Sequence, residues 1–183
     1  GAPMNVAVHL KNLGYNPQMI SRIGNDELGK ELLAFVEEKG LSTDLIQQGE
    51  THLTGVVKAN VSDKNEVTYK IVQPVAWDYI QCDEALETVV EKADVFVYGS
   101  LAARSATSAE TLFKLLKKAR FKVFDVNLRA PHYDQTTLEQ LLSEANMVKM
   151  NANELALLST WYAPNADEET AIMALGTRFN LQT

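Results

Sequence analysis

Hydrophobic residues near the N-terminus repeat with helical spacing and with strand spacing in turn. Residues 3–13 predict a mostly buried helix that Pro3 can begin and Gly14 can end. Residues 17–24 then predict a short strand. A second helix, which Asp26 can cap, ends at a glycine and carries the hydrophobic residues Leu28, Leu32, Leu33, Phe35 and Val36. Strand, loop and helix therefore follow one another in this region.

Residues 54–73 have a different pattern, in which apolar and polar positions alternate. Two alternating runs flank the turn-forming sequence Ser-Asp-Lys-Asn. Because alternation is typical of strands, this segment should be a hairpin with one polar and one apolar face. Its apolar residues are Val57, Ala59 and Val61 on one strand and Val67, Tyr69 and Ile71 on the other. Such a hairpin, projecting from a larger body, could act as a lid.

Helical and strand patterns alternate from residue 83 onward. Helices are expected over 83–92, 107–120, 136–145 and 153–159, and strands over 95–100, 122–127 and 147–150. Thr107 with Glu110 and Thr136 with Glu139 have the spacing of a capping box, which supports two of these helices. Alternating units of this kind predict an α/β fold, with a parallel sheet covered by helices.

The composition is that of an ordinary globular protein. Of the 183 residues, 46% are hydrophobic and 22% are charged, so one domain with a sizeable core is expected. The formal net charge is −7 and no basic stripe is present, which argues against a nucleic-acid partner. Cys82 is the only cysteine, and no leader or long apolar span is found, so a cytoplasmic protein without a membrane partner is expected.

Polar residues follow three of the predicted strands. They are Ser100, the group Asp125, Asn127 and Arg129, and the sequence Asn-Ala-Asn-Glu at 151–154. In an open parallel sheet, ligands bind beyond the carboxyl ends of the strands. Because side chains alternate along an extended chain, Asp125, Asn127 and Arg129 are expected to share one face. Turns and helix caps are the alternative interpretation of each group.

Residues 24–31 nearly match a phosphate-binding P-loop, but we reject this interpretation. Glu31 occupies the position where a P-loop needs Ser or Thr to hold magnesium. Asp26 and Glu27 would also place negative charges among backbone N–H groups that should bind phosphates.

Zinc and cysteine chemistry find no support either. His9, His52 and His132 have no partner at ligand spacing, and Cys82 lies beside Asp83 rather than in an electropositive setting.

Taken in order, these motifs resemble those of the ribokinase (PfkB) family of carbohydrate kinases, most closely its fructokinase-like members. The sequence GAPMNVAVHLKNLG resembles the first family signature, with Ala7, Gly14 and Gly24 at the expected spacing. Further motifs similar to those of the family are IGNDELG, the lid sequence TGVVKANVSDKNEVTYKI followed by PVAWD, YGSLAARS, DVNLR and NANE. The resemblance implies a ribokinase-like parallel-sheet body (1–53 and 74–183) with helices on both faces, and a small β-lid (54–73).

The resemblance also implies roles for individual residues. Gly1, Asn5, Arg104 and Arg129 would bind the sugar, although a surface salt bridge is an equal alternative for Arg104. Asp125, Asn127 and Asn151 would line the phosphate side of an ATP site. Glu154 would order the water shell of Mg²⁺, and either Asn151 or Asn153 could also cap the helix that follows.

Both ends of the family pattern are expected to lie outside this sequence. Only Gly1 remains of the expected glycine pair, and the Gly-Ala-Gly-Asp segment that supplies the catalytic Asp would follow Thr183.

The expected function is an ATP-dependent kinase that phosphorylates a primary hydroxyl of a sugar, with fructose the first choice. The alternatives are a 2-keto-3-deoxygluconate kinase or ribokinase-like enzyme, and a non-catalytic sugar- or nucleotide-binding relative. An unrelated Rossmann-like protein is disfavoured because no G-x-G-x-x-G turn is present. The apolar hairpin face also predicts a homodimer through the lid.

Overall fold

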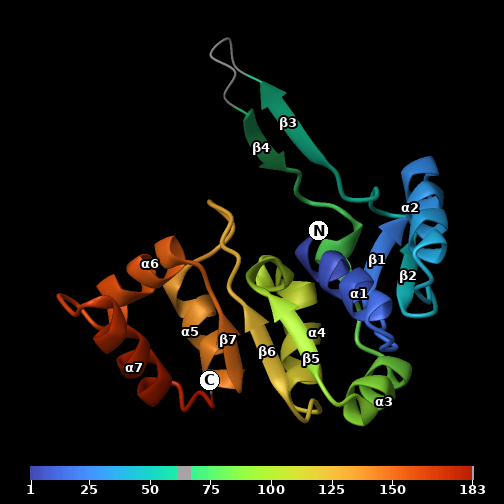
Figure 1. The fold of residues 1–183 in the computed structure, drawn as a ribbon. Helices are drawn as coiled ribbons and strands as arrows, with labels where there is room; N and C mark the ends of the chain where they lie inside the picture. Colours follow the sequence, from blue (N-terminus) through green and yellow to red (C-terminus); the bar gives the residue numbers. More distant parts are fainter. Residues whose placement is uncertain (62–66, 183) are drawn as a thin grey trace. The chain divides into compact units, whose positions relative to one another are not determined.

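The computed structural model describes residues 1–61 and 67–182, and all their side chains except those of 59–61 and 67–69. The chain forms two compact units, Gly1–Gln81 and Cys82–Thr183, which are described separately (Figure 1). Among the described residues, no helix is both long enough and apolar enough to cross a membrane.

The first unit is built on two parallel strands and two helices. They are α1 (Ala2–Asn12), β1 (Ser21–Gly24), α2 (Glu27–Glu38) and β2 (Ile46–Gly49). The two strands pair from Ser21–Ile46 to Gly24–Gly49. A small core of Ala7, Ile23, Val36, Leu41 and Ile46 joins the helices to the strands. Both helices predicted for this region are thus confirmed, although the strand is shorter than expected.

A separate two-stranded sheet completes this unit. The strands β3 (Val57–Val61) and β4 (Val67–Ile71) pair antiparallel, which confirms the predicted hairpin, and a short 3-10 helix, η1 (Ala76–Tyr79), follows. Figure 1 shows this hairpin projecting away from β1 and β2. The predicted Ser-Asp-Lys-Asn turn and the side chains of Ala59, Val61, Val67 and Tyr69 lie outside the described residues.

The second unit alternates strands with helices, as predicted. Its elements are α3 (Glu84–Lys92), β5 (Phe96–Gly99), the 3-10 helix η2 (Ser100–Ala103), α4 (Ala106–Leu116), β6 (Lys122–Asp125), α5 (Gln135–Glu144), β7 (Met147–Lys149), α6 (Ala152–Tyr162) and α7 (Glu168–Arg178). The strands form a parallel sheet in the order β5-β6-β7. Parallel neighbours need crossover connections, and α4 and α5 provide them.

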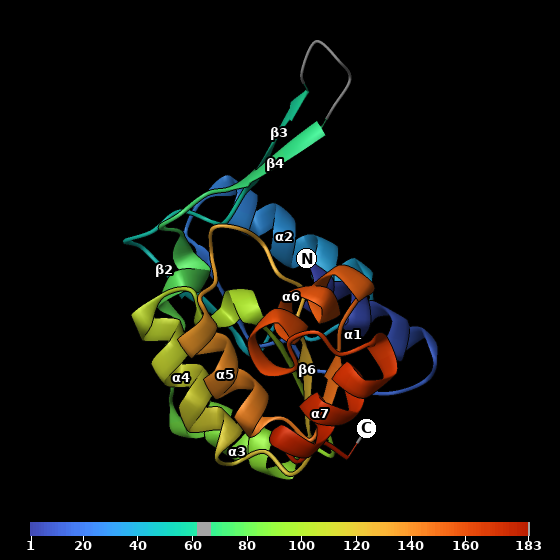
Figure 2. The same ribbon diagram turned by 90° about the vertical axis from the view of Figure 1, so that its left-hand side faces the viewer.

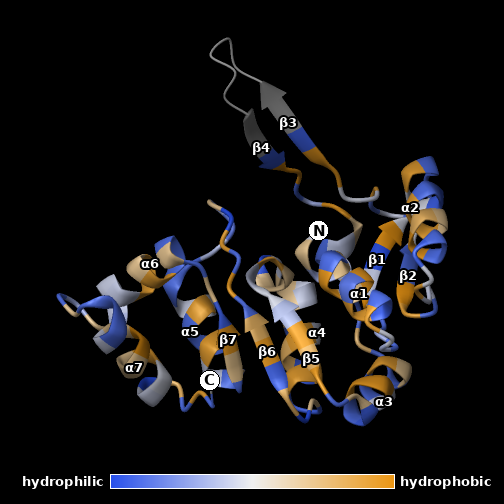
Figure 3. Ribbon diagram, viewed as in Figure 1, coloured by the Kyte–Doolittle hydropathy of each residue, from blue (hydrophilic) through white to orange (hydrophobic). Residues whose placement is uncertain are grey.

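The core of the second unit lies between this sheet and its helices. Figure 2 shows α4 and α5 on the same side of β6, and Figure 3 shows that both helices carry apolar as well as polar residues. Phe124 of β6, Leu141 of α5 and Leu158 of α6 are completely buried in one apolar cluster. The hydroxyl of Tyr98 on β5 donates a 2.8 Å hydrogen bond to the Leu141 carbonyl, so this polar group is also satisfied.

The predicted capping boxes at Thr107 and Thr136 are wrong. Each threonine lies inside its helix, because α4 begins after Ser105 and α5 begins after Asp134. At α5 the Asp134 carboxylate accepts a 2.8 Å hydrogen bond from the Thr137 N–H, and its backbone is extended as an N-cap requires. A charged carboxylate two residues upstream therefore takes the capping position that spacing alone gave to a hydroxyl.

Candidate functional site

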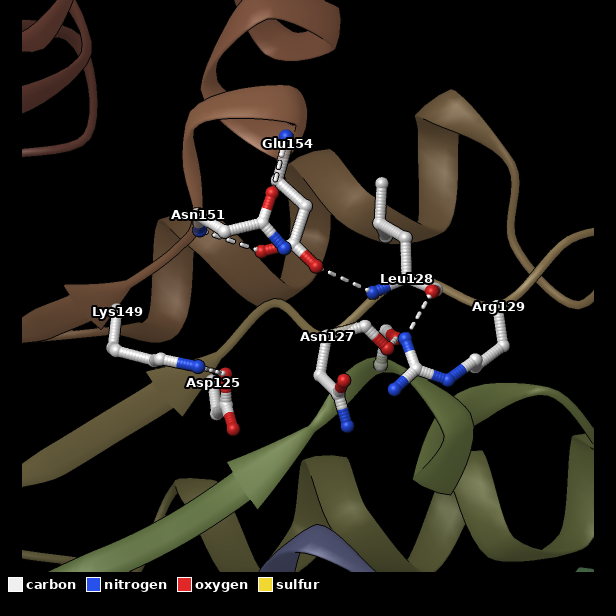
Figure 4. Close-up of polar contacts among 8 residues, drawn as sticks. Asp125, Asn127, Leu128, Arg129, Lys149, Asn151 and Glu154 are labelled. Atoms are coloured by element: carbon white, nitrogen blue, oxygen red, sulfur yellow. Dashed lines mark hydrogen bonds and ion pairs between the residues drawn. The ribbon is translucent and has the colours of Figure 1, made fainter.

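The candidate site lies at the carboxyl ends of the three parallel strands of the second unit. Gly99 of β5 pairs with Asp125 of β6, which in turn pairs with Lys149 of β7, so the three strands end at the same level. The residues that follow them come from three different connections of the chain. Figure 4 shows Asp125, Asn127, Arg129, Asn151 and Glu154 gathered around the ends of β6 and β7. The expected convergence of the residues after β6 and β7 is therefore present within this unit.

The chain does not stay extended after β6, so the expectation that Asp125, Asn127 and Arg129 continue one extended strand is wrong. The strand ends at Asp125, and Asn127 has φ +38°, in the left-handed region that Asn tolerates better than most residues. Val126 between them is fully buried and donates a 3.0 Å hydrogen bond to the Lys149 carbonyl. The left-handed backbone at Asn127 ends the strict alternation from which a common face of the three side chains was predicted.

The Glu154 carboxylate joins the turn after β6 to the start of α6. Its Oε1 accepts a 2.9 Å hydrogen bond from the Leu128 N–H, and its Oε2 accepts one of the same length from the Asn151 N–H. In return, Asn151 Oδ1 accepts a 3.0 Å bond from the Glu154 N–H, which completes a reciprocal cap. Glu154 is only 5% exposed, so these contacts satisfy a buried carboxylate. The capping alternative for Asn151 is thus confirmed.

This arrangement is compatible with magnesium near Glu154 only through water. Each carboxylate oxygen has two acceptor sites, and one site on each already accepts a backbone N–H. Burial of the side chain keeps a hydrated cation away from the carboxylate itself, so magnesium would have to contact the remaining acceptor sites through one of its waters. In the described part of the chain, no group of three or more His, Cys, Asp or Glu residues could hold a metal ion directly.

Lys149 is a member of the site that the sequence analysis missed. Its ammonium lies 3.0 Å from Asp125 Oδ1, with exposed fractions of 65% for the Lys149 side chain and 18% for that of Asp125. Because the lysine of this pair is largely exposed, the pair adds little to stability. It does place a positive charge beside the acid at the end of β6.

The two predicted arginines differ in their surroundings. Arg129 is exposed, and its Nη1 donates a 2.7 Å hydrogen bond to the Leu128 carbonyl. Arg104 is half-buried at the end of η2, and its backbone N–H donates to the Leu101 carbonyl. Ser100, at the start of η2, reaches the Asn127 carbonyl with its hydroxyl at 3.4 Å.

Gly1 and Asn5 belong to the first unit. Gly1 precedes α1, and its carbonyl accepts a 3.1 Å hydrogen bond from the Asn5 N–H. Both residues are exposed, and the Asn5 side chain faces solvent from the first turn of the helix. Their expected contact with a sugar remains a prediction.

Residues 24–31 have the geometry of a capped helix start rather than of a phosphate loop. Asp26 caps α2, and its Oδ1 accepts a 2.8 Å hydrogen bond from the Gly29 N–H. A phosphate would need that N–H group for itself and would be repelled by the carboxylate. The rejection of a P-loop is therefore confirmed.

Comparison with known proteins identifies the family. The model of the pfkB family carbohydrate kinases matches residues 1–179. The fructokinase of Escherichia coli is 30% identical over 173 residues, which cover 87% of this chain and 54% of that protein.

Two solved structures with bound ATP have the same fold. The fructokinase of Xylella fastidiosa superposes with a TM-score of 0.83 at 27% identity. The match covers 97% of this chain and 57% of the fructokinase chain. An uncharacterised sugar kinase of Pyrococcus horikoshii superposes with a TM-score of 0.75 at 28% identity. The match covers 88% of this chain and 56% of the sugar kinase chain. These matches confirm the expected ribokinase-like α/β fold. The chain spans about half the length of the curated relatives it matches, and it belongs to the pfkB family of carbohydrate kinases.

Proposed function

We propose that this chain is part of an ATP-dependent sugar kinase, which transfers the terminal phosphoryl group of ATP to a primary hydroxyl of a sugar, with fructose as the first expected substrate. The observation that carries the proposal is the match of the pfkB family to residues 1–179. The fructokinase relative from Escherichia coli and the two ATP-bound structures support the choice of fructose and of ATP.

The ends of β6 and β7 suit the phosphate side of such a reaction. Phosphoryl transfer depends mainly on positioning and on stabilising negative charge. Asp125, Asn127 and Asn151 are proposed to line this side, and the ammonium of Lys149 adds a positive charge there. Magnesium, when bound with ATP, would neutralise phosphate charge, and Glu154 would hold one of its waters. These assignments rest on the resemblance together with the contacts around Glu154.

The sugar is proposed to bind Gly1, Asn5, Arg104 and Arg129. The Asn5 amide can both donate and accept hydrogen bonds, as sugar hydroxyls do, and its exposed side chain is available for this role. The guanidinium groups can donate several hydrogen bonds to sugar or phosphate oxygens. A base must also remove the proton of the attacked hydroxyl. The resemblance to the family assigns that role to the Asp of its Gly-Ala-Gly-Asp segment.

The hairpin of β3 and β4 is proposed to act as a lid over the sugar and as a dimer interface. A lone two-stranded sheet is marginally stable in water and gains from cover. Val57 at its start is 58% exposed and Leu53, in the segment that leads into it, is 72% exposed, so apolar surface is available for a second copy. Sedimentation of a Val57→Lys variant should show weaker dimerisation than the wild type, and an unchanged dimer would exclude this surface.

A coupled ADP-release assay over a panel of ketoses and aldoses tests the proposed function in the full-length protein. Fructose should give the highest kcat/KM. A preference for 2-keto-3-deoxygluconate or ribose would replace fructose by the alternative sugar. The absence of sugar-dependent ADP would favour a non-catalytic relative, and it would overturn the kinase proposal.

The cytoplasmic location, proposed because the chain has a single cysteine, is tested by cell fractionation.

A further inference from the structure

Asp26 and Thr54 form a tightly bonded group in the first unit, which the proposed kinase chemistry does not use. The Thr54 hydroxyl accepts a 3.0 Å hydrogen bond from the Gly24 N–H and donates a 2.7 Å bond to Asp26 Oδ1. The Thr54 N–H donates a 2.8 Å bond to Asp26 Oδ2. Since Asp26 also caps α2, one carboxylate joins the end of β1, the start of α2 and the segment that leads into β3.

Two glycines allow this close approach. A Cβ at Gly24 would lie 2.6 Å from the His52 carbonyl oxygen and 2.8 Å from the Thr54 nitrogen, and a Cβ at Gly29 would lie 2.9 Å from Thr54 Oγ1. Real Cβ atoms do not come this close to other heavy atoms, so only glycine fits at positions 24 and 29 while the 52–54 segment packs there. Thr54 itself is 6% exposed, which means that its hydrogen bonds are made away from water.

The segment that follows β4 is held beside Thr54 by hydrogen bonds of its own. The Ala76 N–H donates a 2.8 Å hydrogen bond to the Leu53 carbonyl, next to Thr54 in the chain. The buried Asp78 carboxylate accepts a 2.9 Å bond from the Val75 N–H. From there the strands run together, with the Val72 N–H donating to the Val56 carbonyl at 3.3 Å. Both ends of the hairpin are thus held at one place, while β3 and β4 form their own sheet.

We propose that Asp26 and Thr54 are positioning residues that fix the point from which the hairpin leaves the first unit, and so place it for sugar binding. This inference rests on the proposed lid function of the hairpin. Without these bonds the segment before β3 would have more conformations, and only a fraction of them would place the hairpin over the sugar. Apparent sugar affinity falls by that fraction. ATP binding, assigned to the other unit, should change little.

The test compares Thr54→Val with Thr54→Ser in the full-length protein. Valine has a similar shape but removes both hydroxyl bonds, whereas serine keeps them. Thr51→Val, at an exposed threonine in the same segment, is the matched control. Amide hydrogen exchange is measured without ligand at Gly24, Thr54, Val72 and Ala76. Exchange in Thr54→Val should be about tenfold faster or more, with wild-type rates in Thr54→Ser and Thr51→Val.

Kinetics then tests the consequence for the substrate. Thr54→Val should raise KM for the sugar about fivefold or more, with KM for ATP within about twofold of the wild type. Exchange rates equal to the wild type, or equal effects of valine and serine, would overturn the proposal. So would a rise in KM for ATP as large as that for the sugar.

A second variant keeps the test decisive if Thr54→Val does not fold. Asn at position 26 can still cap α2. Its amide N–H₂ would, however, face one of the two Thr54 groups that donate to the wild-type carboxylate. Asp26→Asn is therefore expected to speed amide exchange and to raise KM for the sugar as Thr54→Val does. If the wild type shows no sugar-dependent turnover, the proposed function fails and the sugar-positioning role fails with it. The exchange measurements would still show whether these two residues hold the hairpin.

Discussion

The Glu154 carboxylate on α6 accepts a 2.9 Å hydrogen bond from the backbone N–H of Leu128, which lies 26 residues earlier in the chain. The same carboxylate caps its own helix through the Asn151 N–H. One buried side chain therefore holds both polar connections that follow β6 and β7. Its first effect is to fix the turn at Asn127, and any role toward magnesium comes in addition.

Replacing Glu154 by Gln should lower the free energy of unfolding by about 1–3 kcal/mol, because the new amide N–H₂ would face a backbone donor in a buried place. Urea denaturation of the variant and the wild type measures this difference. Asn153→Ala changes an exposed residue of the same helical turn and should have little effect. Equal stability of Glu154→Gln and the wild type would mean that the carboxylate does not hold this turn.

Asn5→Ala should raise KM for the sugar about tenfold, because one donor and one acceptor for sugar hydroxyls are lost. The side chain is exposed, so the stability should change by less than about 0.5 kcal/mol. Asn12→Ala, at the other end of α1, is the control. Steady-state kinetics at saturating ATP gives the answer, and an unchanged KM would remove Asn5 from the sugar site.

Gly29→Ala and Gly176→Ala should have opposite effects on stability. A Cβ at Gly29 would collide with the Gly24 carbonyl oxygen, so this change should destabilise the protein by about 1–3 kcal/mol. Gly176 lies inside α7 with no atom within 4 Å of the added Cβ, and alanine there should stabilise by about 1 kcal/mol. Thermal unfolding of both variants shows whether each one is less or more stable than the wild type. Destabilisation by Gly176→Ala would contradict the open surroundings of that residue.

The stability that Asp26 provides should depend on pH. Hydrogen bonds from the Thr54 N–H and hydroxyl hold the pKa of the Asp26 carboxyl below its ordinary value. A lowered folded-state pKa means that this stability is fully present above the unfolded-state pKa of about 3.9 and is lost as the pH falls below it. The difference in unfolding free energy between the wild type and Asp26→Asn should therefore shrink from about pH 5 to about pH 3. If the difference in unfolding free energy stays constant over this pH range, the Asp26 carboxylate does not provide the proposed stability.

Local patterns in the sequence predict much of this fold. Asp26 is the N-cap of α2 as expected, and the alternating runs around residues 57–71 form the predicted hairpin. These features depend on residues close in the chain. Capping by Asp134 was missed because several polar residues near a helix start compete for one position, and spacing alone does not rank a carboxylate above a hydroxyl.

The site was harder to predict because its contacts join distant residues. The pairing of Lys149 with Asp125 follows from the register of two parallel strands, which periodicity does not reveal. The hydrogen bond from the Leu128 N–H to Glu154 follows the left-handed backbone at Asn127, where an extended chain was expected. In the same way, nothing in the local pattern linked Thr54 to Asp26, 28 residues earlier.

Direct detection of the product tests the central claim. The full-length protein is incubated with ATP, magnesium and fructose, and the reaction is followed by ³¹P NMR. One sugar phosphomonoester should form for each ADP released, and neither should form when fructose is left out. Release of inorganic phosphate in place of the phosphomonoester, or no turnover with fructose or any other sugar, would contradict the assignment of this chain to an ATP-dependent sugar kinase.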